Sequence, residues 1–145
     1  ERDLRGGPRA TIDGAREFDI ALARGEWARA AEWFFATPHS ATRRTVGAAA
    51  KVRLGELLAR NGHPHAALAA FQRALADHPV DDSRPAAHLG AAQVLLDDLA
   101  NPTGAYQHLY EVLDGGATPD QETTARRLLE RLASSLRNLP RGPRR

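Results

Sequence analysis

The sequence predicts an all-α domain, and three observations carry that prediction. Ala, Leu and Arg dominate the 145 residues while β-branched residues are scarce, a balance that favours helix over sheet. From Thr11 onward the apolar residues recur at helical spacing, with no strand-like alternation. Proline, glycine and an Asn-Gly pair interrupt this pattern at short intervals, which indicates several helices joined by short loops.

Seven helices are expected, each bounded by a proline, a glycine or a capping residue. They cover residues 16–24, 26–37, 42–60, 64–78, 83–100, 101–114 and 118–138. Asn61-Gly62 is a typical helix stop. Ser83 is a plausible cap, and Asn101 before Pro102 is a second one. The last helix has the clearest start, because Thr118 and Gln121 have the spacing of a capping box.

An internal repeat of 35–38 residues runs through these helices. The block of Gly25, Trp27, Ala30 and Phe34 recurs 37 residues on without its Trp, as Gly62, Ala67 and Phe71. Further matches pair Leu54-Gly55 with Leu89-Gly90, and Ala67 and Phe71 with Ala105 and Leu109. Small residues let paired helices approach closely, while a single pair cannot bury its apolar face. Stacking of neighbouring pairs therefore supplies the core.

The second unit resembles the tetratricopeptide repeat, whose pattern is Trp-x-x-Leu-Gly-x-x-Tyr, then Ala-x-x-x-Phe, then Pro. The corresponding residues are Lys51, Leu54, Gly55, Leu58, Ala67, Phe71 and Pro79. Five of the seven match, and Lys51 and Leu58 replace the two aromatic residues. The resemblance covers about residues 12–117. It implies a right-handed α-α superhelix of about three helix pairs plus a C-terminal capping helix; a generic helical bundle is the alternative.

On this interpretation residues 1–10 are a linker and residues 140–145 a basic tail. The repeat domain spans 11–139, with units at 12–40, 41–81 and 82–117 and a capping helix at 118–138. That last helix has an apolar stripe with Leu128 beside it; the stripe is formed by Ala125, Leu129, Leu132, Leu136 and Leu139. Its spacing suits a cap on the last repeat. It also suits a short dimerisation seam, so both a monomer and a homodimer remain open.

The net charge of +2 is concentrated at the two ends. Residues 11–140 carry 14 basic and 16 acidic side chains, a charge of −2. This distribution disfavours a clustered nucleic-acid surface and leaves only the Arg-rich tails for that role. No apolar stretch is long enough to span a membrane, and the absence of Cys excludes disulfides. The absence of Met suggests a piece of a longer protein. A bacterial origin is a separate expectation, and the compartment stays open between the cytoplasm and a soluble domain of a membrane protein.

The motif search predicts no catalytic residue, metal or cofactor. Phosphate-loop, nucleophile-elbow and His-Glu-x-x-His patterns are all absent. His63 and His65 offer two imidazoles, but Pro64 separates them in a turn, and a surface turn is the favoured interpretation. The side chains of Trp33, Phe34 and Phe35 cannot all face one way on a helix. Burial of all three in the core is the favoured interpretation, and exposure of one, or its cover by the adjoining unit, is the alternative.

The resemblance also implies a binding face, because the first helix of each pair lines a concave groove in this family. Carried over by repeat position, the groove residues are Arg16, Asp19, Arg53, Glu56, Arg60, Arg84 and His88, with a slight basic excess. Val52, Ala87 and Ala91 would lie beside them. Val52 and Glu56 stand where a carboxylate-clamp member would have Lys and Asn, which argues against that clamp.

The sequence therefore predicts a non-catalytic protein-interaction module that binds a peptide or helix partner on its concave surface. Binding of nucleic acid or an anionic surface through the Arg-rich tails is one alternative. Self-association through the last helix is another.

Overall fold

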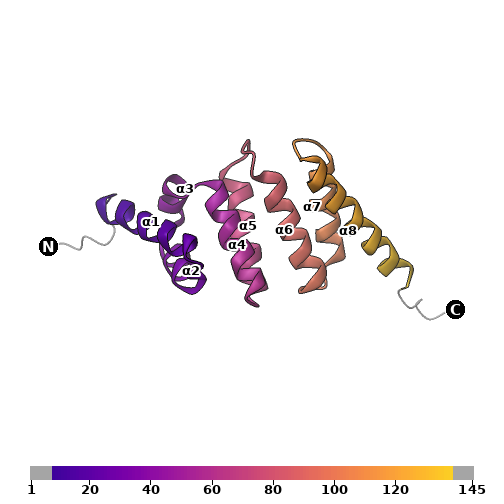
Figure 1. Ribbon diagram of the computed structural model, residues 1–145, viewed down its shortest axis with the longest axis horizontal. Coiled ribbons are helices and arrows are strands. Elements are labelled where there is room, and N and C mark those ends of the chain that lie inside the picture. The colour runs from indigo at the N-terminus through magenta and orange to yellow at the C-terminus, as the bar shows by residue number, and fades with distance from the viewer. Residues whose placement is uncertain (1–7, 139–145) are drawn as a thin grey trace.

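The computed structural model describes residues 8–138, which form eight α-helices and no strand (Figure 1). The helices are α1 (Pro8–Ala23), α2 (Trp27–Ala36), α3 (His39–Thr45), α4 (Ala48–Arg60), α5 (Pro64–Asp77), α6 (Arg84–Asp97), α7 (Pro102–Leu113) and α8 (Pro119–Arg137). The predicted all-α class is confirmed.

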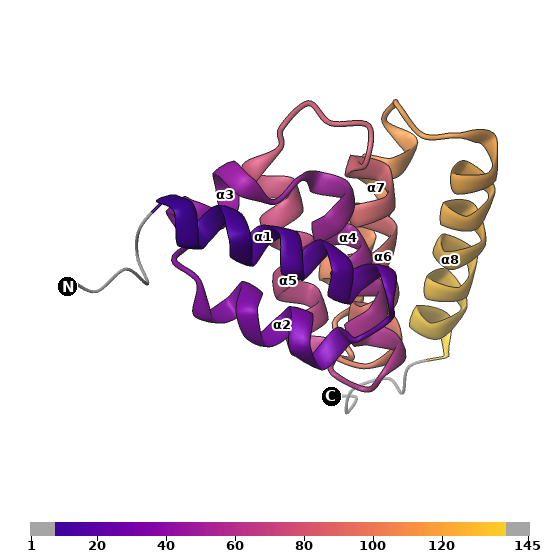
Figure 2. The same ribbon diagram turned by 60° about the vertical axis from the view of Figure 1, so that its left-hand side comes forward.

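The helices form a row of pairs. Helix α1 packs against α2, α4 against α5, and α6 against α7, and each pair also touches the next. Figures 1 and 2 show α1 and α8 at opposite ends of the row. The first helices of successive units follow one another, since α4 contacts α6 and α6 contacts α8. Side chains of these three helices can therefore meet on one face.

The expected linker over residues 1–10 is wrong at its end, because α1 already begins at Pro8. Proline suits the first position of a helix, where its missing N–H would have no partner inside the helix and its fixed φ is helical. Residues 1–7, the remainder of that stretch, lie outside the described residues. So does the predicted basic tail at 140–145.

The single helix expected over residues 42–60 is wrong, because the chain breaks it at Val46 and Gly47. Both have extended backbone, with φ −113° and ψ 122° at Val46 and φ −75° and ψ 170° at Gly47. The Val46 side chain is only 3% exposed. The extended backbone directs the Val46 side chain into the core. It also leaves the Val46 carbonyl without a partner in the hydrogen bonds of either helix, so α3 and α4 are separate helices.

Phe71 of α5 joins the second unit to the third. A Cβ built on Gly55 of α4 would lie 2.7 Å from the Phe71 ring, and one on Gly90 of α6 would lie closer still. The ring itself is 1% exposed. The absence of a side chain at both glycines thus lets one aromatic ring pack against two helices, as the repeat pattern predicts.

The three consecutive aromatic residues of α2 pack against both neighbouring helices, α1 and α5. Phe34 is fully buried, and Trp33 packs against Phe18 of α1 with ring centroids 5.3 Å apart. Phe35 and Phe34 lie beneath the Arg73 guanidinium of α5, at 5.4 and 5.0 Å from their ring centroids. The adjoining unit therefore covers Phe35, and the cation–π contact offsets burial of an Arg73 nitrogen that has no hydrogen-bond partner.

Two of the three predicted helix caps are confirmed. Asn101 accepts a hydrogen bond from the Gly104 N–H at 3.0 Å, and Thr118 and Gln121 form the complete capping box of α8. The prediction for Ser83 is wrong, because its side chain makes no capping bond. Its backbone N–H instead donates to the Asp81 carboxylate at 2.8 Å, which fixes the turn before α6.

Helix α8 closes the row at its C-terminal end. It packs against α7 and α6 through Ala125, Leu128 and Leu132, which are 5% exposed or less. The predicted stripe is thus shifted, with Leu128 rather than Leu129 fully buried and Leu136 52% exposed. Leu139 lies outside the described residues. The buried face of α8 covers the last repeat as a capping helix should.

Candidate functional site

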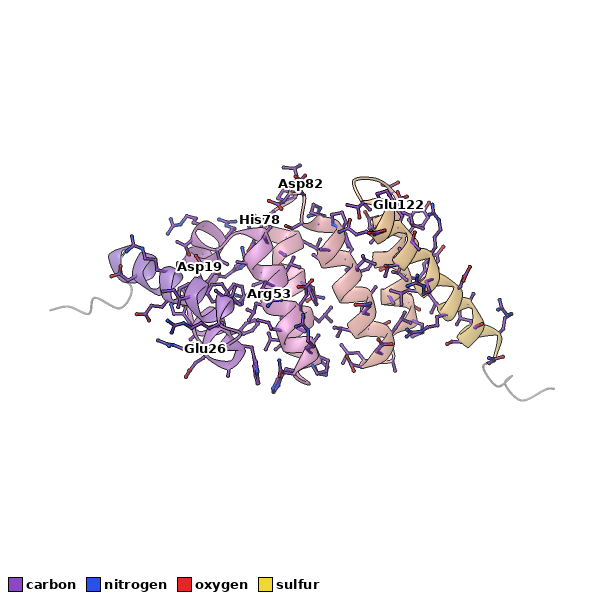
Figure 3. The ribbon with its side chains drawn as sticks, in the orientation of Figure 1. Asp19, Glu26, Arg53, His78, Asp82 and Glu122 are labelled. Carbon is purple, nitrogen blue, oxygen red and sulfur yellow. The ribbon has the colours of Figure 1, made fainter. Side chains whose placement is uncertain are left out.

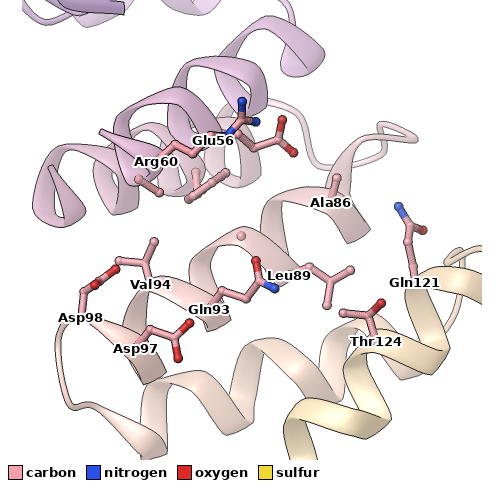
Figure 4. Close-up of a pocket in the computed structure, with 13 residues that line it drawn as sticks. Glu56, Arg60, Ala86, Leu89, Gln93, Val94, Asp97, Asp98, Gln121 and Thr124 are labelled. Carbon is pink, nitrogen blue, oxygen red and sulfur yellow. The ribbon is translucent and has the colours of Figure 1, made fainter. Parts of the chain in front are cut away.

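A groove of about 540 Å³ lies between α4, α6 and α8 (Figure 4). We call it the α4–α6–α8 groove. The residues that line it are Glu56, Ala59, Arg60, Phe71, Ala86, Leu89, Gly90, Gln93, Val94, Asp97, Asp98, Gln121 and Thr124. Three helices that are not consecutive in sequence thus contribute to one concavity.

The groove has apolar residues together with a polar rim. Leu89 and Val94 of α6 supply apolar surface beside the buried Phe71 ring. Gln93 of α6 and Gln121 of α8 supply amide groups that both donate and accept hydrogen bonds (Figure 4). An apolar centre with polar surroundings is the usual composition of a protein interface.

The charged lining residues are more acidic than the sequence suggested. Glu56, Asp97 and Asp98 are carboxylates, and Arg60 is the one cation among the lining residues. Asp97 forms an ion pair with Arg131 of α8, which links the capping helix to the end of α6. The expected slight basic excess is therefore wrong for this groove.

Two of the seven predicted binding residues, Glu56 and Arg60, line the groove. Arg53 is exposed on α4 one turn before Glu56 but is not part of the lining (Figure 3). Arg16 and Asp19 are exposed on α1, also outside the lining. The assignment by repeat position thus selected two residues of α4 that line the groove.

On α6 the repeat position selected Arg84 and His88, and neither residue lines the groove. Arg84 and Gln93 are nine residues apart, which at about 3.6 residues per turn puts them on opposite sides of the helix. His88 is 9% exposed and faces α7, and Ala91 on its side is fully buried. Because α6 is apolar on most of its surface, its periodicity could not indicate which side faces the groove.

Arg84 has a structural role instead. Its guanidinium donates to the backbone carbonyls of Leu75 at 2.7 Å and His78 at 3.0 Å. Both carbonyls belong to the C-terminal end of α5, where helix carbonyls lack partners inside the helix and attract cations. Arg84 therefore secures the connection between α5 and α6.

His88 borders a second concavity of about 560 Å³, which we call the α6–α7 cavity. Its lining residues are Arg84, His88, Tyr106, Gln107, His108, Tyr110 and Glu111. The Nδ1 atoms of His88 and His108 are 2.9 Å apart. Burial lowers the pKa of His88 to about 4, with His108 and Arg84 contributing. Burial also lowers the pKa of His108, against the opposing charge of Glu111.

A third polar group, centred on Lys51, is buried rather than open. The Lys51 side chain is 0% exposed, and its ammonium contacts the Asp77 carboxylate at 3.1 Å and the Val46 carbonyl at 3.0 Å. Its third neighbour is the Nε2 of His78 at 2.8 Å, and His39 reaches Asp77 from outside at 2.9 Å. The ammonium group is thus fully hydrogen-bonded, and the cluster holds α3, α4 and α5 together.

The hydrogen bonds of this cluster influence the pKa of both of its buried charged residues. Burial of Asp77 raises its pKa, but hydrogen bonds from Lys51 and His39 outweigh the burial and keep the pKa below its ordinary value. Burial lowers the pKa of Lys51, and Asp77 opposes that effect. The cluster has no room for a ligand, so we assign it to stability.

Sequence reasoning missed the contributions of Leu89, Gln93, Asp97, Gln121 and Thr124 to the groove. For α8 a signal was present. A capping helix occupies the place of the first helix of a further unit, so its first turns were candidates for the groove face. For α6 the orientation depends on its packing against the neighbouring helices, chiefly α5 and α7.

The residues that the structure describes were searched for metal-binding groups and for membrane-spanning helices. Between residues 8 and 138, no three His, Asp or Glu side chains are grouped so that they could hold a metal ion. His63 does not pair with His65; its ring instead packs against Trp27, with ring centroids 4.8 Å apart. No helix in this range has the length and apolar character needed to cross a membrane.

No protein-family model matches the sequence. No curated protein is similar to it either. Among solved structures, the chain is similar to the TPR domain of Sgt2 from Aspergillus fumigatus, with a TM-score of 0.61 and 15% sequence identity. The similarity covers 99% of this chain and 93% of the Sgt2 domain. With its three helix pairs and its capping helix, this chain has the tetratricopeptide-like fold.

Proposed function

We propose that this chain is a protein-interaction module that binds a peptide segment in the α4–α6–α8 groove. The observation that supports the proposal is the convergence of α4, α6 and α8 on one concavity with apolar residues inside and polar residues around them. A volume of about 540 Å³ is within the range of sites that enclose a ligand group.

The apolar part of the groove suits an anchoring side chain. Leu89 is partly buried and Val94 is 2% exposed. An aliphatic or aromatic side chain of the peptide that packs over them would have its apolar surface removed from water. Burial of such a side chain contributes about 1.5–3 kcal/mol. Interfaces concentrate their binding energy in a few anchors of this kind.

The polar rim suits the backbone of the same segment. Gln93 and Gln121 project from α6 and α8 on two sides of Leu89 (Figure 4). A side-chain amide can satisfy both an N–H and a carbonyl of an extended chain. The groove can thus hold a peptide by general backbone contacts and select it by its anchor.

The proposal can be tested with peptides selected on the immobilised chain from a random phage-displayed library. Affinities of the selected peptides are then measured by fluorescence polarisation. Replacement of the exposed Gln93 by Trp fills the groove without removing a core residue. We expect this variant to bind the peptides at least tenfold more weakly.

The matched control is Gln72→Trp, which places the same side chain on an exposed position of α5 outside the groove lining. Equal helicity of both variants is verified by circular dichroism. Affinity that survives Gln93→Trp, or falls equally in the control, would contradict binding in the groove.

Two other functions predict different outcomes. Binding of an anionic partner by the Arg-rich ends would survive Gln93→Trp but disappear when residues 1–7 and 141–145 are removed, with a steep salt dependence. Self-association through α8 would depend on Leu136, which is 52% exposed, and would appear as a concentration-dependent mass in light scattering. The buried side of α8 already packs on α6 and α7, so it is not free for a second copy.

A further inference from the structure

We propose that His88 and His108 form a binding site for a divalent transition-metal ion, with Zn²⁺ the best-suited candidate. The site lies in the α6–α7 cavity, on the side of α6 opposite the groove, and is independent of the proposed peptide binding. It rests on the direct approach of the two Nδ1 atoms, 2.9 Å apart, from two different helices.

The two imidazoles point equivalent atoms at one spot. A neutral imidazole carries a proton on only one nitrogen, so the metal-free pair must share a single Nδ1–H between two Nδ1 atoms. If that proton moves to the Nε2 of the same ring, both Nδ1 lone pairs converge on the space between them. A bound cation fits this arrangement and requires no net release of protons.

The distance fits a metal after a small movement. Zn–N bonds of about 2.0–2.1 Å in a tetrahedral site place two ligand nitrogens roughly 3.3 Å apart. The pair therefore has to open by a few tenths of an ångström. His108 is only partly buried and borders the open cavity, so rotation of its side chain can provide that opening while the helices stay in place.

The environment of the two rings favours the neutral form that a metal requires. His88 is buried and His108 is partly buried, and burial disfavours the charged imidazolium. A metal ion needs the neutral imidazole, which both residues already present. Imidazole nitrogen is a preferred ligand of zinc, copper and nickel.

The cavity leaves room for the remaining ligands. Its volume of about 560 Å³ accommodates several water molecules beside the two nitrogens. Glu111 lies three residues after His108 on the same helix, and its charge acts on the His108 ring. With only two protein nitrogens in place, the site has open positions like those of catalytic zinc sites rather than the closed set of a structural one.

The test is isothermal titration of the full 145-residue chain, prepared without a histidine tag, with ZnCl2. We expect one zinc ion per chain. Affinity should fall at least tenfold in His88→Ala and in His108→Ala. His65→Ala is the matched control, since His65 is exposed on the first turn of α5, and it should bind zinc like the unaltered chain.

A measurement on the unaltered chain avoids dependence on variants that fold poorly. The ¹⁵N resonances of the His88 and His108 rings should shift on zinc addition at Nδ1, leaving Nε2 as the protonated nitrogen. Absence of binding at about millimolar zinc, coordination through Nε2, or equal affinity in all three variants would overturn the proposal.

Discussion

Lys51 and Asp77 form an ion pair of 3.1 Å in which the two side chains are 0% and 3% exposed. Lys51 stands where the repeat pattern has an aromatic residue, and its ammonium also binds the Val46 carbonyl freed by the break between α3 and α4. The charged residue and the broken helix look like two separate departures from the repeat pattern. They form one structural feature, because the Lys51 ammonium binds the carbonyl at the break.

Removal of one member of this pair should be costly. Lys51→Met keeps the aliphatic length but leaves the Asp77 carboxylate buried without its main partner, which destabilises proteins by about 3–5 kcal/mol. The double variant Lys51→Met with Asp77→Leu should recover part of that loss, because no charge is then left buried. Urea unfolding of the unaltered chain, the two single variants and the double variant measures both effects. A double variant as unstable as the sum of the single ones would contradict the expectation.

Acid should remove the contribution of Asp77 in a defined pH window. Its folded-state pKa lies below the ordinary value, which is about 3.9 in an unfolded chain. The stabilisation is therefore complete above that value and is lost as the pH falls through the lower, folded-state pKa. Urea midpoints from pH 7 to 3 should show a constant penalty for Asp77→Asn down to about pH 5, shrinking below about pH 4.

Asp82→Asn provides the comparison for this profile, because Asp82 is an exposed carboxylate in the loop before α6 (Figure 3). Its effect should be small at every pH. A penalty for Asp77→Asn that is as large at pH 3 as at pH 7 would show that the carboxylate charge is not what stabilises the cluster.

His88 should give the chain a second, higher window of acid sensitivity. The unfolded state binds a proton near pH 6.5, whereas the folded state, with His88 facing His108, Arg84 and the nearby Glu111, resists protonation until about pH 4. Because the unfolded state holds more protons between these values, stability falls as the pH is lowered through them, by roughly 2–3 kcal/mol.

The His88→Gln variant should flatten this part of the profile. The exposed His65→Gln serves as its control and should leave the profile as in the unaltered chain. The measurement is the free energy of unfolding in urea between pH 7 and 4 without added metal. An unchanged slope in His88→Gln would locate the acid sensitivity elsewhere.

The fold could be predicted because the residues that specify it act locally. Gly55, Ala67 and Phe71 have fixed spacings along two consecutive helices, and the same spacings produce the packing in the structure. Thr118 and Gln121 likewise indicate the start of α8 within four residues of sequence. Signals of this kind need no knowledge of distant contacts.

Residues of the groove were predicted only on α4, where the amphipathic pattern indicates which side of the helix is exposed. On α4 the charged residues Glu56 and Arg60 are confined to one side, and that side lines the groove. On α6 buried residues surround most of the helix, so its contacts with α4, α5, α7 and α8 together determine which face is open. The partners of Lys51 lie up to 27 residues away, a distance at which spacing carries no information.

Gly90 offers a test of the packing in which helix propensity and sterics predict opposite signs. Alanine is better than glycine inside a helix by about 1 kcal/mol, so Gly90→Ala would stabilise α6 if propensity decided. A Cβ at Gly90 would instead overlap the Phe71 ring, which Gly55 of α4 confines from the other side. Overpacking of this kind costs about 1–3 kcal/mol, so we expect net destabilisation. Phe71→Leu should relieve it, making the double variant more stable than the summed single effects, and strictly additive urea-unfolding energies would contradict this account.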